Sequence, residues 1–158
     1  MRVALAQQLG GTGSVKLGEL PDPVPAAGQV LVRVHGAGVG PWDVGFLGGG
    51  FPGIALPFVP GQEVAGLVEA AGDGAAVQPG DRVYASLFPA GGGFAELALA
   101  SADRLAPMPG RVSFAEAAGL VIGAGTAYEG LVDRGRGRGF DLRRSGSRPG
   151  AYRGRIHP

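Results

Sequence analysis

The chain has 158 residues, 45% of them apolar and 17% charged, a composition that suits one globular domain with an ordinary buried core. It contains no cysteine and two histidines, which excludes disulfides, cysteine nucleophiles and zinc sites built on thiolates. There is neither an apolar run long enough to span a bilayer nor the apolar core of a secretory signal, so we expect a cytoplasmic protein without a membrane partner.

The first half of the chain predicts short strands separated by turns. Apolar and alternating segments predict strands at residues 2–7, 15–20 and 29–37, and the last of these is the best defined. Residues 40–43 predict a turn or the start of a short helix, since Pro41 is tolerated in a first helical turn. The glycine-rich residues 48–53 predict a loop.

The pattern of short strands continues as far as residue 106. Strands are predicted at residues 62–71, 81–87, 94–100 and 104–106, with glycine and proline between them. Closely spaced strands joined by tight turns favour a mainly β, largely antiparallel barrel or sandwich. Strands and helices do not alternate before residue 112, so we expect no parallel nucleotide-binding sheet in this part.

A helix is predicted to follow the strands. Ser113 and Glu116 have the spacing of a capping box, in which each side chain bonds the other residue's backbone N–H. We expect Gly123 and Gly125 to interrupt this helix and a second helical segment to run from Thr126 to residue 134.

Charge divides the chain at residue 133. Residues 1–133 carry six basic and twelve acidic side chains, whereas residues 134–158 carry eight arginines and one aspartate. We therefore predict a domain at 1–133 and a disordered Arg/Gly-rich tail at 134–158. Such a tail suits contact with nucleic acid, but it also has the composition of GC-rich DNA translated out of frame. We favour the second interpretation and expect no nucleic-acid partner.

Residues 1–134 resemble the GroES-like domain of medium-chain dehydrogenase/reductases, in the zinc-independent quinone oxidoreductase branch. The resemblance depends on the joint order and spacing of short motifs, each weak alone. They are PVP at 23–25, GQVLVRV at 28–34, GPWD at 40–43, PGQEVAG at 60–66, VQPGDRV at 77–83, GGFAE at 92–96, SFAEAA at 113–118 and TAYE at 126–129.

This resemblance implies a partly open antiparallel β-barrel with short helices and a C-terminal linker helix. It also implies NADPH-dependent hydride transfer to a quinone or an activated alkene. Zinc-dependent members of the family carry a metal-binding histidine where this chain has Gln62, and an amide is a poor zinc ligand. We therefore expect no zinc.

Five candidate site residues follow from the resemblance. Pro41 and Trp42 would form a substrate wall, Asp43 would position substrate or cofactor, and Gln62 and Thr126 would contact the cofactor. Gly40 stands where relatives carry asparagine. Structural roles are open for the same residues: a turn acceptor for Asp43, a strand-end bond for Gln62, a helix N-cap for Thr126 and a core aromatic for Trp42.

The resemblance ends where the family's Rossmann domain begins, so we expect a truncated or frameshifted product. The one GxGxxG match, residues 48–53, precedes prolines that forbid the helix a phosphate site needs. Such a chain is expected to be inactive, to bind NADPH poorly and to self-associate through apolar surface near residues 114–132. Two alternatives stay open: a non-enzymatic interaction module whose arginine-rich tail binds nucleic acid, and an enzyme completed by a separately encoded Rossmann domain.

Overall fold

The computed structural model describes residues 1–133, so the predicted arginine-rich tail lies outside the described residues. Contacts between residues divide the chain into two units, Met1–Ile122 and Gly123–Pro158. This division falls eleven residues before the domain boundary that composition predicts, and that boundary stays a prediction. No helix of the described part is both long enough and apolar enough to cross a bilayer.

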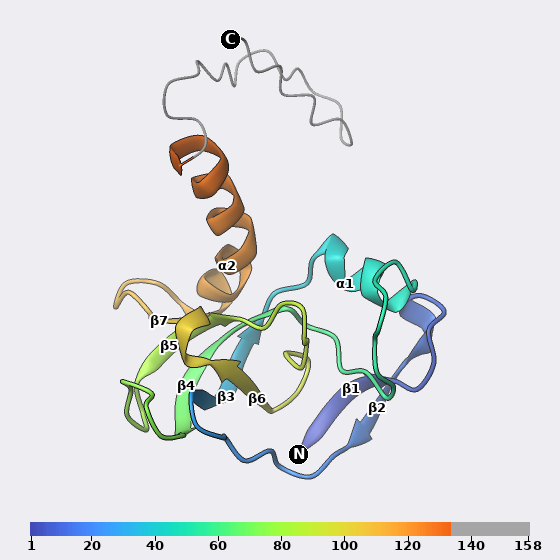
Figure 1. The fold of residues 1–158 in the computed structure, drawn as a ribbon, viewed down its shortest axis with the longest axis horizontal. Coiled ribbons are helices and arrows are strands. Elements are labelled where there is room, and N and C mark those ends of the chain that lie inside the picture. Colours follow the sequence, from blue (N-terminus) through green and yellow to red (C-terminus); the bar gives the residue numbers. More distant parts are fainter. Residues whose placement is uncertain (134–158) are drawn as a thin grey trace. The chain divides into compact units, whose positions relative to one another are not determined.

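Antiparallel strands make up most of the regular secondary structure of the first unit, as predicted (Figure 1). A two-stranded sheet pairs β1 with β2, and a five-stranded sheet has the order β6-β3-β4-β5-β7. The strands are β1 (Arg2–Ala6), β2 (Val15–Glu19), β3 (Gln29–Ala37), β4 (Glu63–Ala71), β5 (Arg82–Ser86), β6 (Leu97–Ser101) and β7 (Leu105–Pro107). The helices are α1 (Pro41–Leu47), α2 (Phe114–Tyr128), the 3-10 turns Thr12–Ser14 and Ala102–Arg104, and a π-helical turn at Glu129–Asp133.

Valines and alanines on alternate positions of the five-stranded sheet form its main core. Val30 and Val32 of β3 pack with Val64 and Val68 of β4 and with Val83 of β5, and each is at most 2% exposed. This arrangement follows from the two-residue period of a strand, which places every second side chain on the same face. The predicted alternation along β3 is confirmed, although Leu31 on the opposite face is buried as well.

Glycine is required at the centre of this sheet. Gly66 of β4 lies opposite Val34 of β3 and Val83 of β5. A Cβ atom placed there would lie 2.0 Å from the Arg33 carbonyl oxygen, which is far inside van der Waals contact. The two central strands can therefore approach this closely only while residue 66 has no side chain.

The segment that leads into β6 differs from the prediction. Strand β6 begins at Leu97, whereas the sequence pattern predicts a strand from residue 94. Phe94 instead accepts a hydrogen bond from the Ala4 amide (2.8 Å), and Ala95 bridges Val3 of β1. Residues 94–100 thus do alternate as strand residues do, but residues 94–95 pair with β1 and residues 97–100 pair with β3.

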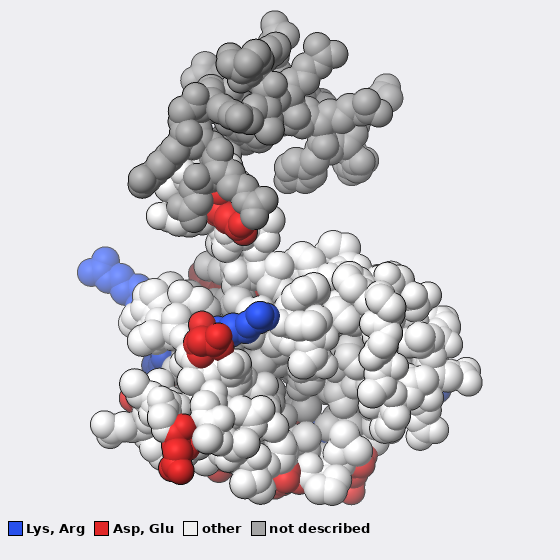
Figure 2. Space-filling model, viewed as in Figure 1, with Lys and Arg blue, Asp and Glu red and all other residues white. Residues whose placement is uncertain are grey.

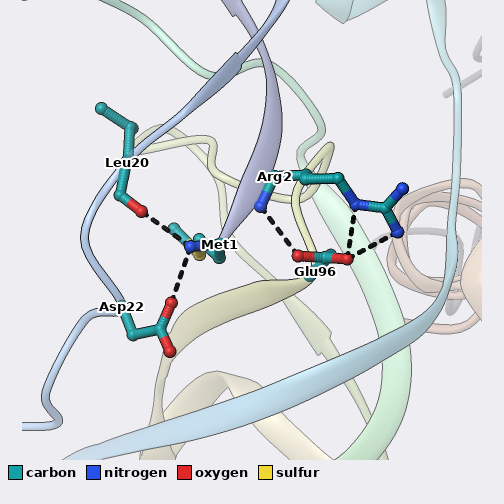
Figure 3. Close-up of polar contacts among 5 residues, drawn as sticks. All are labelled: Met1, Arg2, Leu20, Asp22 and Glu96. Atoms are coloured by element: carbon teal, nitrogen blue, oxygen red, sulfur yellow. Dashed lines mark hydrogen bonds and ion pairs between the residues drawn. The ribbon is translucent and has the colours of Figure 1, made fainter.

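Polar contacts at the start of β1 tie it to the segment that follows β2 and to the segment that precedes β6. The Met1 amino group donates to the Leu20 carbonyl and to Asp22, both at 2.8 Å (Figure 3). The Arg2 backbone and guanidinium both donate to the Glu96 carboxylate at 2.8 Å. Exposed ion pairs stabilise folded proteins by at most about 1 kcal/mol, so these contacts fix the register of β1 more than they stabilise the chain.

Helix α2 begins at the predicted capping box but is longer than predicted. The Glu116 amide donates to the Ser113 hydroxyl (3.2 Å), and the Glu116 carboxylate accepts from the Ser113 amide (2.9 Å). The expected interruption at Gly123 and Gly125 is wrong, because α2 continues to Tyr128. Each glycine costs a helix about 1 kcal/mol relative to alanine, which is too little to end a helix among residues that favour it.

The capping box gives a direct test of this helix start. We expect Ser113→Ala to lower the free energy of unfolding by about 1 kcal/mol, because it removes the acceptor for the Glu116 amide. Urea denaturation followed by circular dichroism measures this change. Ser101 precedes a 3-10 turn without capping it, so Ser101→Ala should change the same quantity by less than about 0.5 kcal/mol. Equal effects of the two substitutions would show that the box contributes nothing.

Candidate functional site

Asp43 is buried and ties two loops together. It is 2% exposed and occupies the third position of helix α1. One carboxylate oxygen accepts from the Gly40 amide at 2.8 Å, which satisfies a donor at the helix start, and the other accepts from the Gly61 amide at 2.9 Å. Both oxygens are therefore engaged by backbone. In this arrangement Asp43 places the Gly40–Trp42 turn against the segment that carries Gln62.

Gln62 and Trp42 bring unpaired polar atoms into the same region. The Gln62 side chain is fully buried, and within the described part of the chain neither its amide nitrogen nor its amide oxygen has a hydrogen-bond partner. The indole nitrogen of Trp42 is buried and unpaired in the same sense. A buried polar atom without a partner costs about 1 to 3 kcal/mol, so a group that both donates and accepts would stabilise this region.

Glu63 is a third buried polar residue, adjacent in sequence to Gln62. It is 3% exposed, and its carboxylate accepts from the Ile122 amide at 2.8 Å. Burial raises the pKa of the Glu63 carboxyl group, the hydrogen bond from Ile122 lowers it, and the charge of Asp43 raises it again. The sequence alone is compatible with a structural role or a place in the cleft wall for Glu63 and indicates no partner. Its position in the motif between Gly61 and Gly66 was the available signal, but nothing local indicated its partner 59 residues away.

Phenylalanines gather at and beside helix α1, and no pattern in the sequence indicated them as site residues. Phe46 of α1 stacks on Phe51 with ring centroids 4.0 Å apart, and Phe58 and Phe88 lie within 5.8 Å of Phe46. Phe46, Phe51 and Phe58 line a cavity of about 530 Å³. Flat aromatic walls suit a planar apolar ligand, because rings stack on one another in offset or edge-on arrangements.

The remaining candidates are placed as follows. Pro41 is the first residue of α1, and the Trp42 ring folds back over Gly40, where a Cβ atom would lie 2.2 Å from it. Thr126 lies inside α2 near its C-terminal end, so its alternative role as a helix N-cap is wrong. Pro41, Trp42, Asp43 and Gln62 all belong to the first unit, whereas Thr126 belongs to the second.

The surface of the described residues has no feature typical of a nucleic-acid site on the face drawn in Figure 2. Blue side chains lie apart from one another there, and most of the surface is uncharged. In the part of the chain that the structure describes, no three histidine, cysteine or acidic side chains are grouped to hold a metal ion.

Comparison with known proteins places this geometry in a family. The alcohol dehydrogenase GroES-like domain family matches residues 26–110. The quinone oxidoreductase of Mus musculus is 38% identical over 141 residues, and that of Homo sapiens is 37% identical over 135. These matches cover 87% and 84% of this chain but only 42% and 41% of the relatives, so the chain spans about two fifths of their length.

Solved structures agree with this similarity. The Escherichia coli quinone oxidoreductase in complex with NADPH matches with a TM-score of 0.80 and 27% identity, covering 85% of this chain and 41% of the other. Mycobacterial Rv1454c in complex with NADPH matches with a TM-score of 0.78 and 34% identity, covering 85% and 42%. The relatives are oxidoreductases, which favours that interpretation over the interaction module considered from the sequence.

Proposed function

Since this chain belongs to the alcohol dehydrogenase GroES-like domain family, in its quinone oxidoreductase branch, we propose that it forms the acceptor-side wall of an NADPH-dependent quinone reductase site. The observation that carries the proposal is the unpaired Gln62 amide. It belongs to a buried polar cluster beside helix α1 that consists of Trp42, Asp43, Gln62 and Glu63. A carboxamide or a quinone carbonyl offers the kind of partner that this amide lacks.

The described residues fit a nicotinamide cofactor at this place. A buried amide with both its donor and its acceptor free can pair with a carboxamide, which has the complementary atoms. When bound, NADPH supplies the hydride, and the protein contributes binding, orientation and exclusion of water. The relatives solved with NADPH support the choice of cofactor.

Each residue of the cluster then has a distinct task. Gln62 turns its amide towards the bound ligand, because pairing removes the cost of burying it alone. Asp43 acts through backbone and holds the Gly40 and Gly61 amides, which positions Gln62 and Trp42. Trp42 offers an indole N–H to the acceptor, while the aromatic cavity beside α1 receives its flat apolar part. Thr126 stays a predicted contact to the cofactor.

A chimera tests the proposal. Residues 1–133 are joined to the cofactor-binding part of the human quinone oxidoreductase, and NADPH oxidation is followed with a naphthoquinone and with cyclohexenone. We expect NADPH-dependent turnover, and Gln62→Leu should lower kcat/KM about tenfold, which corresponds to about 1.4 kcal/mol. In the unfused chain the same substitution should raise the free energy of unfolding by about 1 kcal/mol, because it removes the buried unpaired amide.

Gln78 is the matched control, since it is exposed and lies in a turn of the same unit. Gln78→Leu should change neither kcat/KM nor the free energy of unfolding by more than about 0.5 kcal/mol. A folded chimera that is inert with both acceptors, while the human enzyme prepared alongside it turns over, would overturn the proposed function.

A further inference from the structure

The buried Glu63 carboxylate meets helix α2 at one backbone position. Its oxygen accepts from the Ile122 amide at 2.8 Å, inside the helix rather than at its start. In a regular α-helix that amide points to the carbonyl four residues back, which is Ala118. A side chain from strand β4 thus bonds to a helix donor 59 residues further along the chain.

Backbone that follows β3 and backbone of helix α2 both lie close to Glu63. The Gly38 amide donates to the Glu63 carbonyl at 3.0 Å. A Cβ atom at Gly38 would lie 2.5 Å from the Glu63 carboxylate and 2.7 Å from the Ala118 carbonyl. Ala117 and Ala118 of α2 pack on Ala65 of β4, so small residues bring helix and strand close together. The carboxylate is therefore fixed between the end of β3 and helix α2.

The contact lies where the first unit ends. Ile122 is the last residue of that unit, and Gly123 is the first residue of the next. Among the described residues, no later amide of α2 donates a hydrogen bond to the sheet. Glu63 is consequently the polar anchor closest to the boundary within the described residues.

We propose that Glu63 is a positioning residue that holds helix α2 against the sheet by accepting a hydrogen bond from the Ile122 amide, a contact called the clasp below. The charge of the Glu63 carboxylate sets how firmly the helix is held. The clasp itself is a property of this chain. Its use in hydride transfer, which is to hold helix α2 in place, rests on the proposed function.

The charge on Glu63 depends on pH in a defined direction. Burial raises the pKa of the carboxyl group, the Ile122 amide lowers it, and the charge of Asp43 on α1 raises it. The other parts packed against it, Gly38, Ala118 and Ile122, bring no charged side chain. A charged acceptor makes a stronger hydrogen bond than a neutral one, so the clasp is firm above this raised pKa and loosens as the pH falls through it.

The contribution of Glu63 to the free energy of unfolding should change with pH in the opposite direction to the strength of the clasp. A raised pKa means that the folded chain favours the protonated carboxyl group. This contribution to folding is complete below the ordinary pKa of glutamate and is lost as the pH rises through the raised value. The firm clasp thus exists in the pH range where burial of the charge opposes folding, so the contact serves position more than stability.

Nuclear magnetic resonance of the full 158-residue chain tests the clasp. We expect the chemical shift of the Ile122 amide proton to change with pH, at a midpoint above the ordinary glutamate pKa. In Glu63→Ala the same amide should exchange with solvent about 10- to 100-fold faster at neutral pH, as loss of a bond to a charged acceptor requires. Glu63→Gln keeps an acceptor without charge, so it should protect Ile122 in part and abolish the pH dependence.

Glu69 supplies the matched control, because it lies on the same strand, is exposed and bonds Arg33. Glu69→Ala should leave the exchange and the pH response of Ile122 unchanged. If Glu63→Ala does not fold, the pH dependence of the Ile122 amide shift in the unsubstituted chain and in Glu63→Gln still tests the proposal. The proposal is wrong if the chemical shift of the Ile122 amide proton does not change with pH, or if it changes with pH identically in Glu63→Gln. Neither result bears on chimera activity, so the failure of one proposal is distinguishable from the failure of the other.

Discussion

Substitution of Gly66 by alanine should lower the free energy of unfolding by about 3 kcal/mol or more. The added Cβ atom would lie 2.0 Å from the Arg33 carbonyl oxygen and 3.0 Å from the Val32 side chain. Because the nearest atom belongs to backbone in a central strand pair, relief requires β3 and β4 to separate. Small domains are stable by about 5 to 15 kcal/mol, so a loss of this size is a large part of the total. Urea denaturation gives the value.

Gly13 provides the comparison for this substitution. No atom lies within 4 Å of a Cβ built there. Gly13→Ala should therefore change the free energy of unfolding by no more than about 0.5 kcal/mol. Similar stability of the two variants would show that the central strands yield easily and that the close approach at Gly66 is not a constraint.

Asp43→Ala should lower the free energy of unfolding by about 3 to 5 kcal/mol. It leaves the Gly40 and Gly61 amides without their acceptor in a buried place, and a hydrogen bond to a charged group contributes about 1.5 to 3 kcal/mol. Asp43→Asn retains one acceptor oxygen, so we expect about half of this loss. Urea denaturation of the three proteins measures the series.

Asp73 serves as the control for Asp43, because it is exposed in a turn of the same unit. Asp73→Ala should alter the free energy of unfolding by less than about 0.5 kcal/mol. A small loss in Asp43→Ala, similar to that in Asp73→Ala, would mean that the two loops do not depend on the carboxylate. In that case Asp43 would be free to contact a ligand directly.

Local patterns account for most of the fold. The alternation of residues 29–37 and 62–71 predicts β3 and β4 almost to the residue, because one face of each strand is buried in the same core. The Ser113 capping box predicts the start of α2, since its two hydrogen bonds join residues three apart. The segment 94–96 was misjudged because its partner, β1, lies at the other end of the chain.

The candidate site was predictable only in part, because its contacts join residues that are far apart in the sequence. Motif resemblance indicated Asp43 and Gln62, and both lie in the buried polar cluster. The sequence could not indicate that Asp43 bonds Gly61, or that Glu63 bonds Ile122, because both contacts depend on how β4 sits against α1 and α2. The aromatic cavity was missed because its phenylalanines are scattered over residues 46–58 without a period.

The bond between Arg2 and Glu96 joins residues 94 apart (Figure 3), and β1 also pairs with Phe94 and Ala95. Ribosomes add about 5 to 20 residues per second, so the first strand waits roughly 5 to 20 seconds for this partner segment to be synthesised. During that interval the apolar face of β1 has only β2 to pair with, and an isolated two-stranded hairpin is marginally stable. The nascent chain therefore exposes Val3 and Leu5 until residues 94–96 have been synthesised, and its yield in cells should depend on chaperones that bind short apolar segments.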